Sequence, residues 1–255
     1  MRIAVITGAS SGMGRDFVRQ IGSYERFDEV WVIARRADQL AQLQAECPFP
    51  VRPVSLDLTK EESFEAYRAL LEAEKPQIGL LVNCAGYGKF GRADEIPLPD
   101  QLGMVDLNAK ALTAVTTLSL PYLRAGDRIL QLDSLSAFQP VPYMAVYGAT
   151  KAYVLSYSRA LNAELQAQGI RVMAVSPGWV QTPFFDRAMR PGDDAVTYFN
   201  RVYTSEFVVK KALRDLYRTK KDLCIPGLPV WGQTVMVKLL PHKMVMKIWL
   251  KQQKH

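Results

Sequence analysis

The chain has 255 residues, of which 49% are hydrophobic and 22% charged, a mixture typical of an ordinary globular protein. Its net charge of +7 is uneven, since residues 205–255 hold 11 Lys or Arg and 3 Asp or Glu, whereas the rest holds 21 and 22. No apolar run approaches the roughly 20 residues of a membrane-spanning helix, and three cysteines without CxxC spacing predict reduced cytosolic thiols, not a disulfide frame or metal site.

Short apolar runs alternate with longer segments of helical spacing along most of the chain. The predicted strands are 2–7, 30–34, 51–57, 79–83, 128–133, 171–176 and 222–226. The predicted helices include 12–23, 37–46, 60–74, 100–123 and 147–168. Most strand runs are continuously apolar, which is typical of parallel strands buried on both faces. The alternation predicts an α/β fold, a Rossmann-type doubly wound parallel sheet of about seven strands, in a single domain over residues 1–227.

The final segment, residues 228–255, has a different pattern. Apolar residues recur at helical spacing on both sides of Pro241, and the lysines lie mostly off the apolar face. This predicts a C-terminal amphipathic, basic helical tail over 231–253 that packs on the body, covers a pocket, dimerises or makes peripheral contact with a membrane. The alternative is a tail whose charge is only a solvated helix face.

A glycine-rich loop, TGASSGMGR at residues 7–15, follows the first predicted strand and opens the first predicted helix. Glycines in this context permit a tight turn and let backbone N–H groups approach a pyrophosphate at a helix N-terminus. The loop therefore predicts a dinucleotide cofactor, with an empty structural turn as the alternative. The residues expected to contact the cofactor are Gly8, Ser10, Ser11, Gly12, Met13, Gly14 and Arg15.

The end of the second predicted strand indicates which dinucleotide is bound. NAD-binding domains usually carry an acid there, but this position is Ala34, and Arg35 and Arg36 follow it. A guanidinium is suited to bidentate contact with a phosphate. The pattern favours NADP(H), whose 2′-phosphate these arginines would bind, unless they merely begin a solvated helix.

An ordered set of motifs extends from this loop into the second half of the chain. It comprises TGASSGMG (7–14), NCAG (83–86), Asn108, Ser134, Tyr147-Gly-Ala-Thr-Lys151 and PGWVQT (177–182). The set resembles the short-chain dehydrogenase/reductase family over residues 2–227. Two small departures are Cys84, where the family usually has a second Asn, and Ser136, which competes with Ser134. The position of Ser134 at the end of the fifth strand, 13 residues before the tyrosine, favours Ser134.

The resemblance implies interconversion of a ketone and a secondary alcohol, with a catalytic set of Tyr147, Lys151, Ser134 and Asn108. A free tyrosine has a pKa near 10, and a nearby lysine cation lowers it, so Tyr147 would act as general acid and base. By resemblance, Lys151 also binds the nicotinamide ribose, Ser134 holds the substrate oxygen and Asn108 orders a water. A second YxxxK pair, Tyr217 with Lys221, is predicted to be a solvated helix face.

The resemblance also implies contacts along the rest of the cofactor. Asp57 and Leu58 would meet the adenine, although Asp57 can also cap the following helix. The remaining positions would line the ribose and nicotinamide: Asn83, Ala85, Gly86, Pro177, Gly178, Val180 and Thr182.

The loops after the strands carry apolar and aromatic side chains, which are expected to form the substrate pocket. They are Leu135, Phe138, Tyr143, Trp179, Phe184 and Phe185, together with Val141 and Met189. They indicate a bulky lipophilic carbonyl or alcohol, such as a steroid or a fatty acyl ketone. The alternative is that about half of them simply pack the core.

Four other functions compete with this one. A serine hydrolase is disfavoured because both histidines, His242 and His255, lie in the tail. A reductase of small carbonyl compounds and a catalytically silent NADP-binding sensor or scaffold stay open. The neutral body argues against nucleic-acid binding. The resemblance implies a cytoplasmic homo-oligomer, a dimer or tetramer, formed through 100–123 and 147–168.

Overall fold

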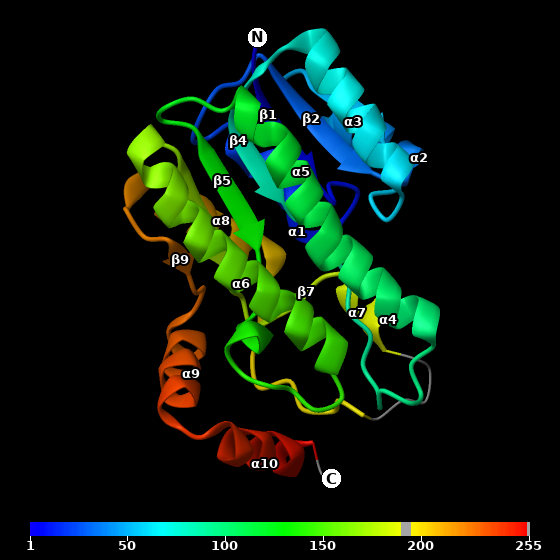
Figure 1. Cartoon of the computed structure of the whole chain (residues 1–255), viewed down its shortest axis with the longest axis vertical. Coiled ribbons are helices and arrows are strands. Elements are labelled where there is room, and N and C mark those ends of the chain that lie inside the picture. The colour runs from blue at the N-terminus through cyan, green and yellow to red at the C-terminus, as the bar shows by residue number, and fades with distance from the viewer. Residues whose placement is uncertain (190–194, 254–255) are drawn as a thin grey trace.

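Seven parallel strands form the central sheet of the molecule (Figure 1). The computed structural model describes residues 1–189 and 195–253. The strand order is β3-β2-β1-β4-β5-β6-β9, so the chain moves outward from β1 in one direction and from β4 in the other. This reversal places a crevice at the carboxyl ends of β1 and β4, where open α/β sheets bind ligands. The strands are β1 (Arg2–Thr7), β2 (Glu29–Ala34), β3 (Val51–Ser55), β4 (Gln77–Asn83), β5 (Arg128–Leu132), β6 (Arg171–Val175) and β9 (Leu223–Cys224).

Helices cover both faces of the sheet, which confirms the doubly wound fold predicted from the sequence. On one face lie α1 (Gly12–Ile21), α2 (Ala37–Glu46) and α8 (Ser205–Arg218). The other face is covered by α3 (Glu61–Glu74), α5 (Leu112–Ser119) and α6 (Ala145–Leu165). A π-helical turn, Asp106–Ala111, joins α4 (Leu98–Val105) to α5.

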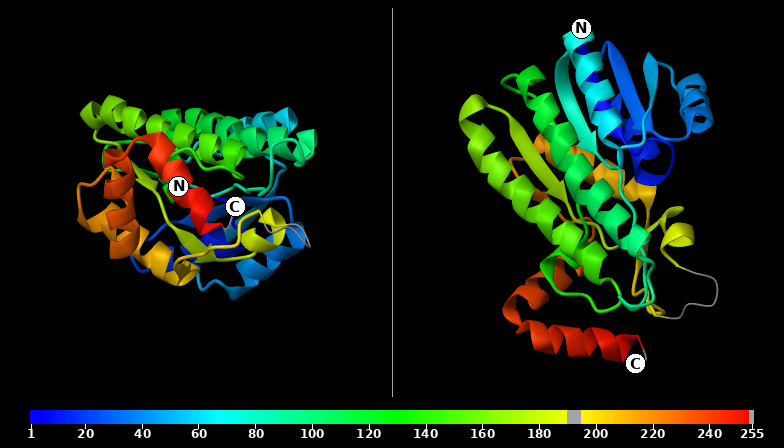
Figure 2. Two further views of the ribbon diagram at one scale, coloured as in Figure 1. Left: turned by 90° about the horizontal axis from the view of Figure 1, so that it is seen from below. Right: turned by 45° about the vertical axis from the view of Figure 1, so that its right-hand side comes forward.

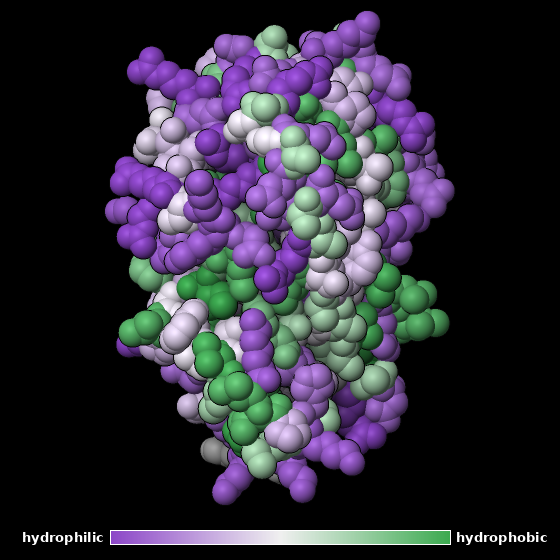
Figure 3. Space-filling model, turned by 60° about the vertical axis from the view of Figure 1, so that its left-hand side comes forward, coloured by the Kyte–Doolittle hydropathy of each residue, from purple (hydrophilic) through white to green (hydrophobic). Residues whose placement is uncertain are grey.

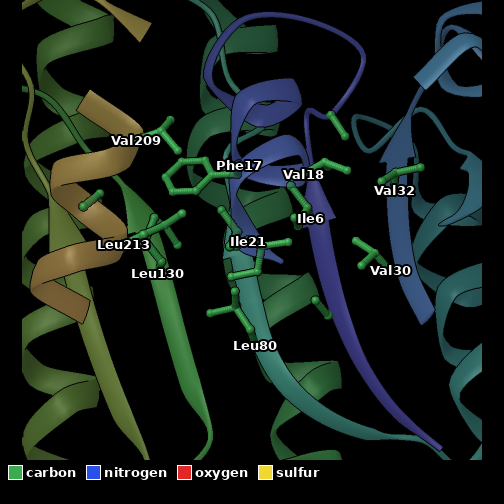
Figure 4. Close-up of a cluster of buried hydrophobic side chains, with 14 of the residues drawn as sticks. Ile6, Phe17, Val18, Ile21, Val30, Val32, Leu80, Leu130, Val209 and Leu213 are labelled. Atoms are coloured by element: carbon green, nitrogen blue, oxygen red, sulfur yellow. The ribbon is translucent and has the colours of Figure 1, made fainter. Parts of the chain in front are cut away.

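The core is divided by the sheet into two layers, because successive strand residues point to opposite faces. Ile6 packs toward α1 and α8, whereas Val5 packs toward α3 and α5. Figure 4 shows the first layer, in which Phe17 of α1 lies between Leu130 of β5 and Val209 of α8. Both layers are fully buried, as the continuously apolar strand sequences predict.

A second, two-stranded parallel sheet pairs β7 (Trp179–Gln181) with β8 (Val202–Thr204). The sequence analysis did not predict it, because the two strands are three residues each and carry no periodic signal. The short helix α7 (Phe184–Ala188) follows β7. Together they build a flap beyond the carboxyl ends of β1 and β4.

The tail forms α9 (Leu228–Leu239) and α10 (His242–Gln252), separated at Pro241 as predicted. Both views in Figure 2 place α10 beyond the carboxyl ends of the strands. Trp249 and Gln253 anchor it: Trp249 Nε1 donates to the Pro142 carbonyl at 3.0 Å, and Gln253 Oε1 accepts from two backbone N–H groups in the segment that follows α7. Among the described residues, no helix is long and apolar enough to cross a membrane.

Candidate active site

A cavity of about 570 Å³ opens at the carboxyl ends of the strands. It is lined by the glycine loop, by the predicted catalytic side chains Ser134, Tyr147 and Lys151, and by Trp249 and Gln252 of α10. Most of the predicted cofactor residues line this space. They are Gly8, Ser10, Ser11, Gly12, Met13, Gly14, Arg35, Arg36, Asp57, Leu58, Ala85, Gly86, Pro177, Gly178, Val180 and Thr182.

The glycine loop leaves no room for side chains at its two tightest positions. Gly8 has a φ of +70°, and a Cβ there would lie 2.8 Å from the backbone of Ala85. A Cβ on Gly14 would lie 2.6 Å from the carbonyl carbon of Gly8. The two glycines therefore let the loop pack closely on Ala85 and on itself at the N-terminus of α1, while the loop lines the cavity. A tight loop at a helix N-terminus is suited to bind a pyrophosphate.

Two arginines follow β2 at the edge of the same cavity. Arg36 is held against the loop, because its Nη2 donates to Ser10 Oγ and Ser11 Oγ, both at 2.9 Å. Arg35 is exposed and lies 3.9 Å from Asp57. Asp57 also accepts from the backbone and hydroxyl of Thr59, so it caps the following turn while it lines the cavity.

Three of the predicted cofactor and catalytic residues lie outside the cavity lining. Arg15 points away and pairs with Glu46 at 2.5 Å. Asn83 donates to Thr116 Oγ1 at 2.9 Å inside the core. Asn108 sits on the π-helical turn behind Gly86, where its amide bonds both backbone groups of Tyr87 at 2.8 and 3.0 Å. These contacts give Asn83 and Asn108 roles in holding the cavity wall.

The predicted catalytic side chains come from two parts of the fold. Tyr147 and Lys151 lie one turn apart on α6, and the Lys151 ammonium is 5.8 Å from the centre of the Tyr147 ring. Lys151 Nζ donates to the Leu132 carbonyl at 2.8 Å, which ties it to the end of β5. Ser134 follows β5 and lines the cavity with Tyr147, and its Oγ accepts from the backbone N–H of Ser136 at 3.2 Å. Ser134 lowers the pKa of Tyr147, which favours Ser134 over the neighbouring Ser136 as the partner of the tyrosine.

A buried carboxyl lies directly behind this group. Asp133 accepts from Ser176 Oγ at 2.6 Å, while its Oδ1 has no hydrogen-bond partner among the described residues. Burial raises the pKa of Asp133 to about 7, against the opposing effects of Ser176 and Lys151. Burial lowers the pKa of Lys151, and Asp133 opposes that effect. Burial also raises the pKa of Tyr147, whereas Ser134 lowers it.

The raised pKa of Asp133 predicts a pH-dependent stability that Asp133→Asn removes. Because the native pKa lies above the unfolded value, the native state binds more protons between about pH 4 and pH 7. The free energy of unfolding therefore falls as the pH rises through that window. The free energy of unfolding of the variant minus that of wild type is expected to rise by about 2 kcal/mol or more across the window.

Urea unfolding near pH 5 and near pH 8 measures this difference. Asp94→Asn is the matched control, because Asp94 is exposed and the hydrogen bond from Arg92 lowers its pKa. The control difference should change little between the two pH values. A pH-independent difference for Asp133→Asn would mean that Asp133 does not titrate in this range.

The substrate end of the cavity is walled by aromatic side chains. Phe184 packs on the Tyr147 ring at 5.5 Å between centroids, and Trp179 contacts Phe185 and Trp249 at 5.9 and 6.5 Å. Of the predicted pocket residues, Leu135, Trp179, Phe184 and Phe185 line the cavity, as does Val141. Phe138 instead lies beside Lys238 of α9, and Tyr143 lines a separate small cavity.

Several lining residues were not named from the sequence. Asp133 was readable as a charge that ends a buried strand. No local sequence pattern indicated that Arg187 on α7 would line the cavity. Five others come from the segment after residue 195 and from the tail, and only the folded chain brings them here: Tyr198, Asn200, Gln233, Trp249 and Gln252.

The family can be assigned from these features together with the sequence. The family described as short chain dehydrogenase matches residues 2–191. The chain belongs to this family and is an oxidoreductase of it.

Relatives and solved structures agree with this assignment. The chain is 36% identical over 187 residues to serine 3-dehydrogenase of Rhizobium radiobacter, an alignment that covers 71% of the chain and 72% of the relative. A short-chain dehydrogenase from Sphingobium yanoikuyae in complex with NADPH superposes with a TM-score of 0.79, at 29% identity over 93% of this chain and 92% of that one. The bulky-bulky ketone specific alcohol dehydrogenase from Comamonas testosteroni gives 0.72, at 25% identity over 94% and 92%.

Proposed function

We propose that the protein is an NADP(H)-dependent oxidoreductase that interconverts a ketone and a secondary alcohol of a bulky, lipophilic compound. The observation that carries the proposal is the convergence of Ser134, Tyr147 and Lys151 in one cavity with the glycine loop. A sensor or scaffold would need the loop but not the three side chains beside it.

The residues at one end of the cavity fit a dinucleotide phosphate. The backbone cradle of Gly8 and Gly14 excludes side chains, and the loop opens α1. Arg35 and Arg36 supply two guanidinium groups where NAD-binding domains usually have an acid, which favours NADP(H). The NADPH complex of the Sphingobium yanoikuyae relative supports the same choice. When bound, the cofactor supplies or accepts a hydride.

Ser134, Tyr147 and Lys151 supply the proton transfer and the positioning of the substrate oxygen that hydride transfer also requires. In the reducing direction, Tyr147 gives its phenolic proton to the developing alkoxide oxygen, which Ser134 holds in place. The Lys151 cation stabilises the phenolate that remains, because an opposite charge favours the ionised form. In the oxidising direction the same phenolate removes the alcohol proton.

The wall of the cavity supports the choice of substrate class. Trp179, Phe184, Phe185 and Trp249 are in contact and enclose the space beyond Tyr147. Aromatic walls of this kind bury apolar ligand surface, which stabilises complexes with bulky groups. The ketone-specific enzyme of Comamonas testosteroni offers a parallel for bulky substrates. Reduction of a small carbonyl compound is the second candidate, which the similarity to serine 3-dehydrogenase favours.

Turnover with a ketone panel tests the proposal, with absorbance of the reduced nicotinamide as the signal. We expect NADPH to support reduction of steroid or acyl ketones with a kcat/KM at least tenfold above that with NADH, an order of magnitude set by one phosphate contact. Preference for small carbonyl compounds would select the second candidate. Nucleotide binding without turnover would select the sensor.

Trp249→Ala separates the two substrate classes. Because Trp249 closes the aromatic wall, its removal is expected to raise KM for a bulky ketone about tenfold and leave a small ketone unaffected. Trp231→Ala is the matched control, since Trp231 is a 54%-exposed tryptophan of α9 that does not line the cavity. Equal effects of the two substitutions would contradict a role for α10 in binding substrate.

The oligomeric state of the protein and its location in the cell stay predictions. Several apolar side chains of α9 and α10 point outward, and Figure 3 shows hydrophobic side chains gathered on that part of the surface. The most exposed are Leu228, Trp231, Leu239 and Met244. We propose, as the sequence analysis did, a cytoplasmic homo-oligomer, and sedimentation of the purified protein measures its size.

A further inference from the structure

The helix α7 lies over the part of the cavity that joins the glycine loop to Tyr147. Thr182, two residues before α7, is in contact with the loop, since a Cβ on Gly12 would lie 3.3 Å from the Thr182 side chain. Phe184 of α7 packs on Tyr147. A cofactor that extends from the loop to the tyrosine would therefore pass beneath α7.

Arg187 is the cation that α7 brings to this place. The Cζ of its guanidinium lies over the Tyr87 ring, 3.7 Å from the ring centre. Tyr87 is itself fixed, because its ring is buried and its hydroxyl donates to the Asp100 carbonyl at 3.0 Å. Stacking covers one face of the guanidinium and leaves the N–H groups at its edge for other partners.

No carboxylate of the described residues lies within ion-pair distance of Arg187. Its side chain lines the same cavity as Arg35. Partial burial lowers the pKa of Arg187, repulsion from Arg35 lowers it further, and Tyr87, Asp100 and Asp57 oppose these effects only in part. Two guanidinium groups that line one cavity in this way are suited to bind an anion.

We propose that Arg187 binds a phosphate group of the dinucleotide cofactor and so fastens α7 over the bound molecule. The inference rests on the proposed function, because it takes the cavity to hold a dinucleotide. The cofactor has two phosphate sources of the same chemistry within this cavity, the pyrophosphate and the 2′-phosphate. A planar guanidinium with free edges forms bidentate hydrogen bonds with either.

Equilibrium binding of NADPH and NADH, followed by nicotinamide fluorescence, tests the proposal. Arg187→Gln is expected to raise the Kd for NADPH by about tenfold or more, since it removes a charge-assisted contact. Weaker binding of NADPH alone assigns the 2′-phosphate, and equal weakening of NADH assigns the pyrophosphate. Arg187→Lys, which keeps the charge without the fork, should fall between wild type and Arg187→Gln.

Arg92→Gln is the matched control, because Arg92 is an exposed arginine paired with Asp94 on the surface. Its Kd values should equal those of wild type. Kd values of Arg187→Gln within twofold of wild type for both nucleotides, in a variant with an unchanged Tm, would overturn the proposal while leaving the proposed function intact. A wild-type protein that binds neither nucleotide would instead overturn the proposed function, and this inference with it.

Discussion

Replacing Tyr147 by phenylalanine is expected to lower kcat for ketone reduction by about a thousandfold or more, the loss typical of removing a general acid. The variant keeps the ring that packs on Phe184 and loses only the phenolic proton. The substrate oxygen then keeps Ser134 as a hydrogen-bond partner but has no acid that can give it a proton. The Kd for NADPH should stay within about twofold of wild type, because the phenol contributes to chemistry more than to cofactor affinity.

The second YxxxK pair provides the control for this experiment. Tyr217 has the same spacing to Lys221, but its hydroxyl donates to Glu25 at 2.7 Å and Arg128 lies over its ring. Tyr217→Phe is therefore expected to leave kcat unchanged and to cost about 1 kcal/mol of stability, the usual worth of one hydrogen bond. A Tyr147→Phe protein that retains a tenth of wild-type kcat would rule out Tyr147 as the proton donor.

Substitution of Gly14 by alanine is expected to abolish measurable nucleotide binding and to lower the free energy of unfolding by about 2 kcal/mol or more, as overpacking does. The added Cβ would lie 2.6 Å from the Gly8 carbonyl carbon, so the turn and the start of α1 must separate. The backbone N–H groups that face the cavity would move with them. Fluorescence titration with NADPH and thermal unfolding measure the two effects.

Gly232 is the matched control for Gly14. It lies within α9, and a Cβ added there meets nothing within 4 Å. Gly232→Ala is expected to raise the free energy of unfolding by up to about 1 kcal/mol, because glycine is a poor helix former. If Gly14→Ala folds poorly, Gly12→Ala is the milder variant, because its added Cβ meets only the Thr182 side chain at 3.3 Å and no backbone, although the φ of +55° also strains an alanine there. Wild-type affinity in both loop variants would contradict the phosphate role of the loop.

The sheet could be predicted from the sequence because its signal is local. A run such as RIAVIT is apolar on both faces only if helices cover both faces, and β1 is buried in this way. The break at Pro241 could be predicted for the same reason, since proline cannot continue a helix. The β7–β8 pair carried no such signal in segments of three residues each.

The candidate site likewise has a part with a local sequence signal, which could be predicted, and a part without one. The glycine loop and the pair Tyr147–Lys151 are close in sequence, so spacing alone places them on one turn or one helix face. Asp133, Arg187 and Trp249 reach the cavity from three distant parts of the chain. They come together only because of how α7 and α10 cross the carboxyl ends of the strands. A periodic sequence pattern carries no information about that arrangement. Phe138 and Tyr143 are close in sequence to Ser134 and Tyr147, yet they lie outside the cavity lining. Closeness in sequence therefore did not predict their position.

The position of α10 has a consequence for how the ligand preference of such a protein can change. The family match ends at residue 191, and the residues that close the far end of the cavity lie beyond it, in 195–253. The wall of the cavity is thus shared: Trp179, Phe184 and Phe185 lie within the family match, whereas Trp249 and Gln252 lie beyond it. A chimaera that exchanges 195–253 with a relative's equivalent would therefore alter one side of the wall and leave Ser134, Tyr147, Lys151 and the glycine loop in place.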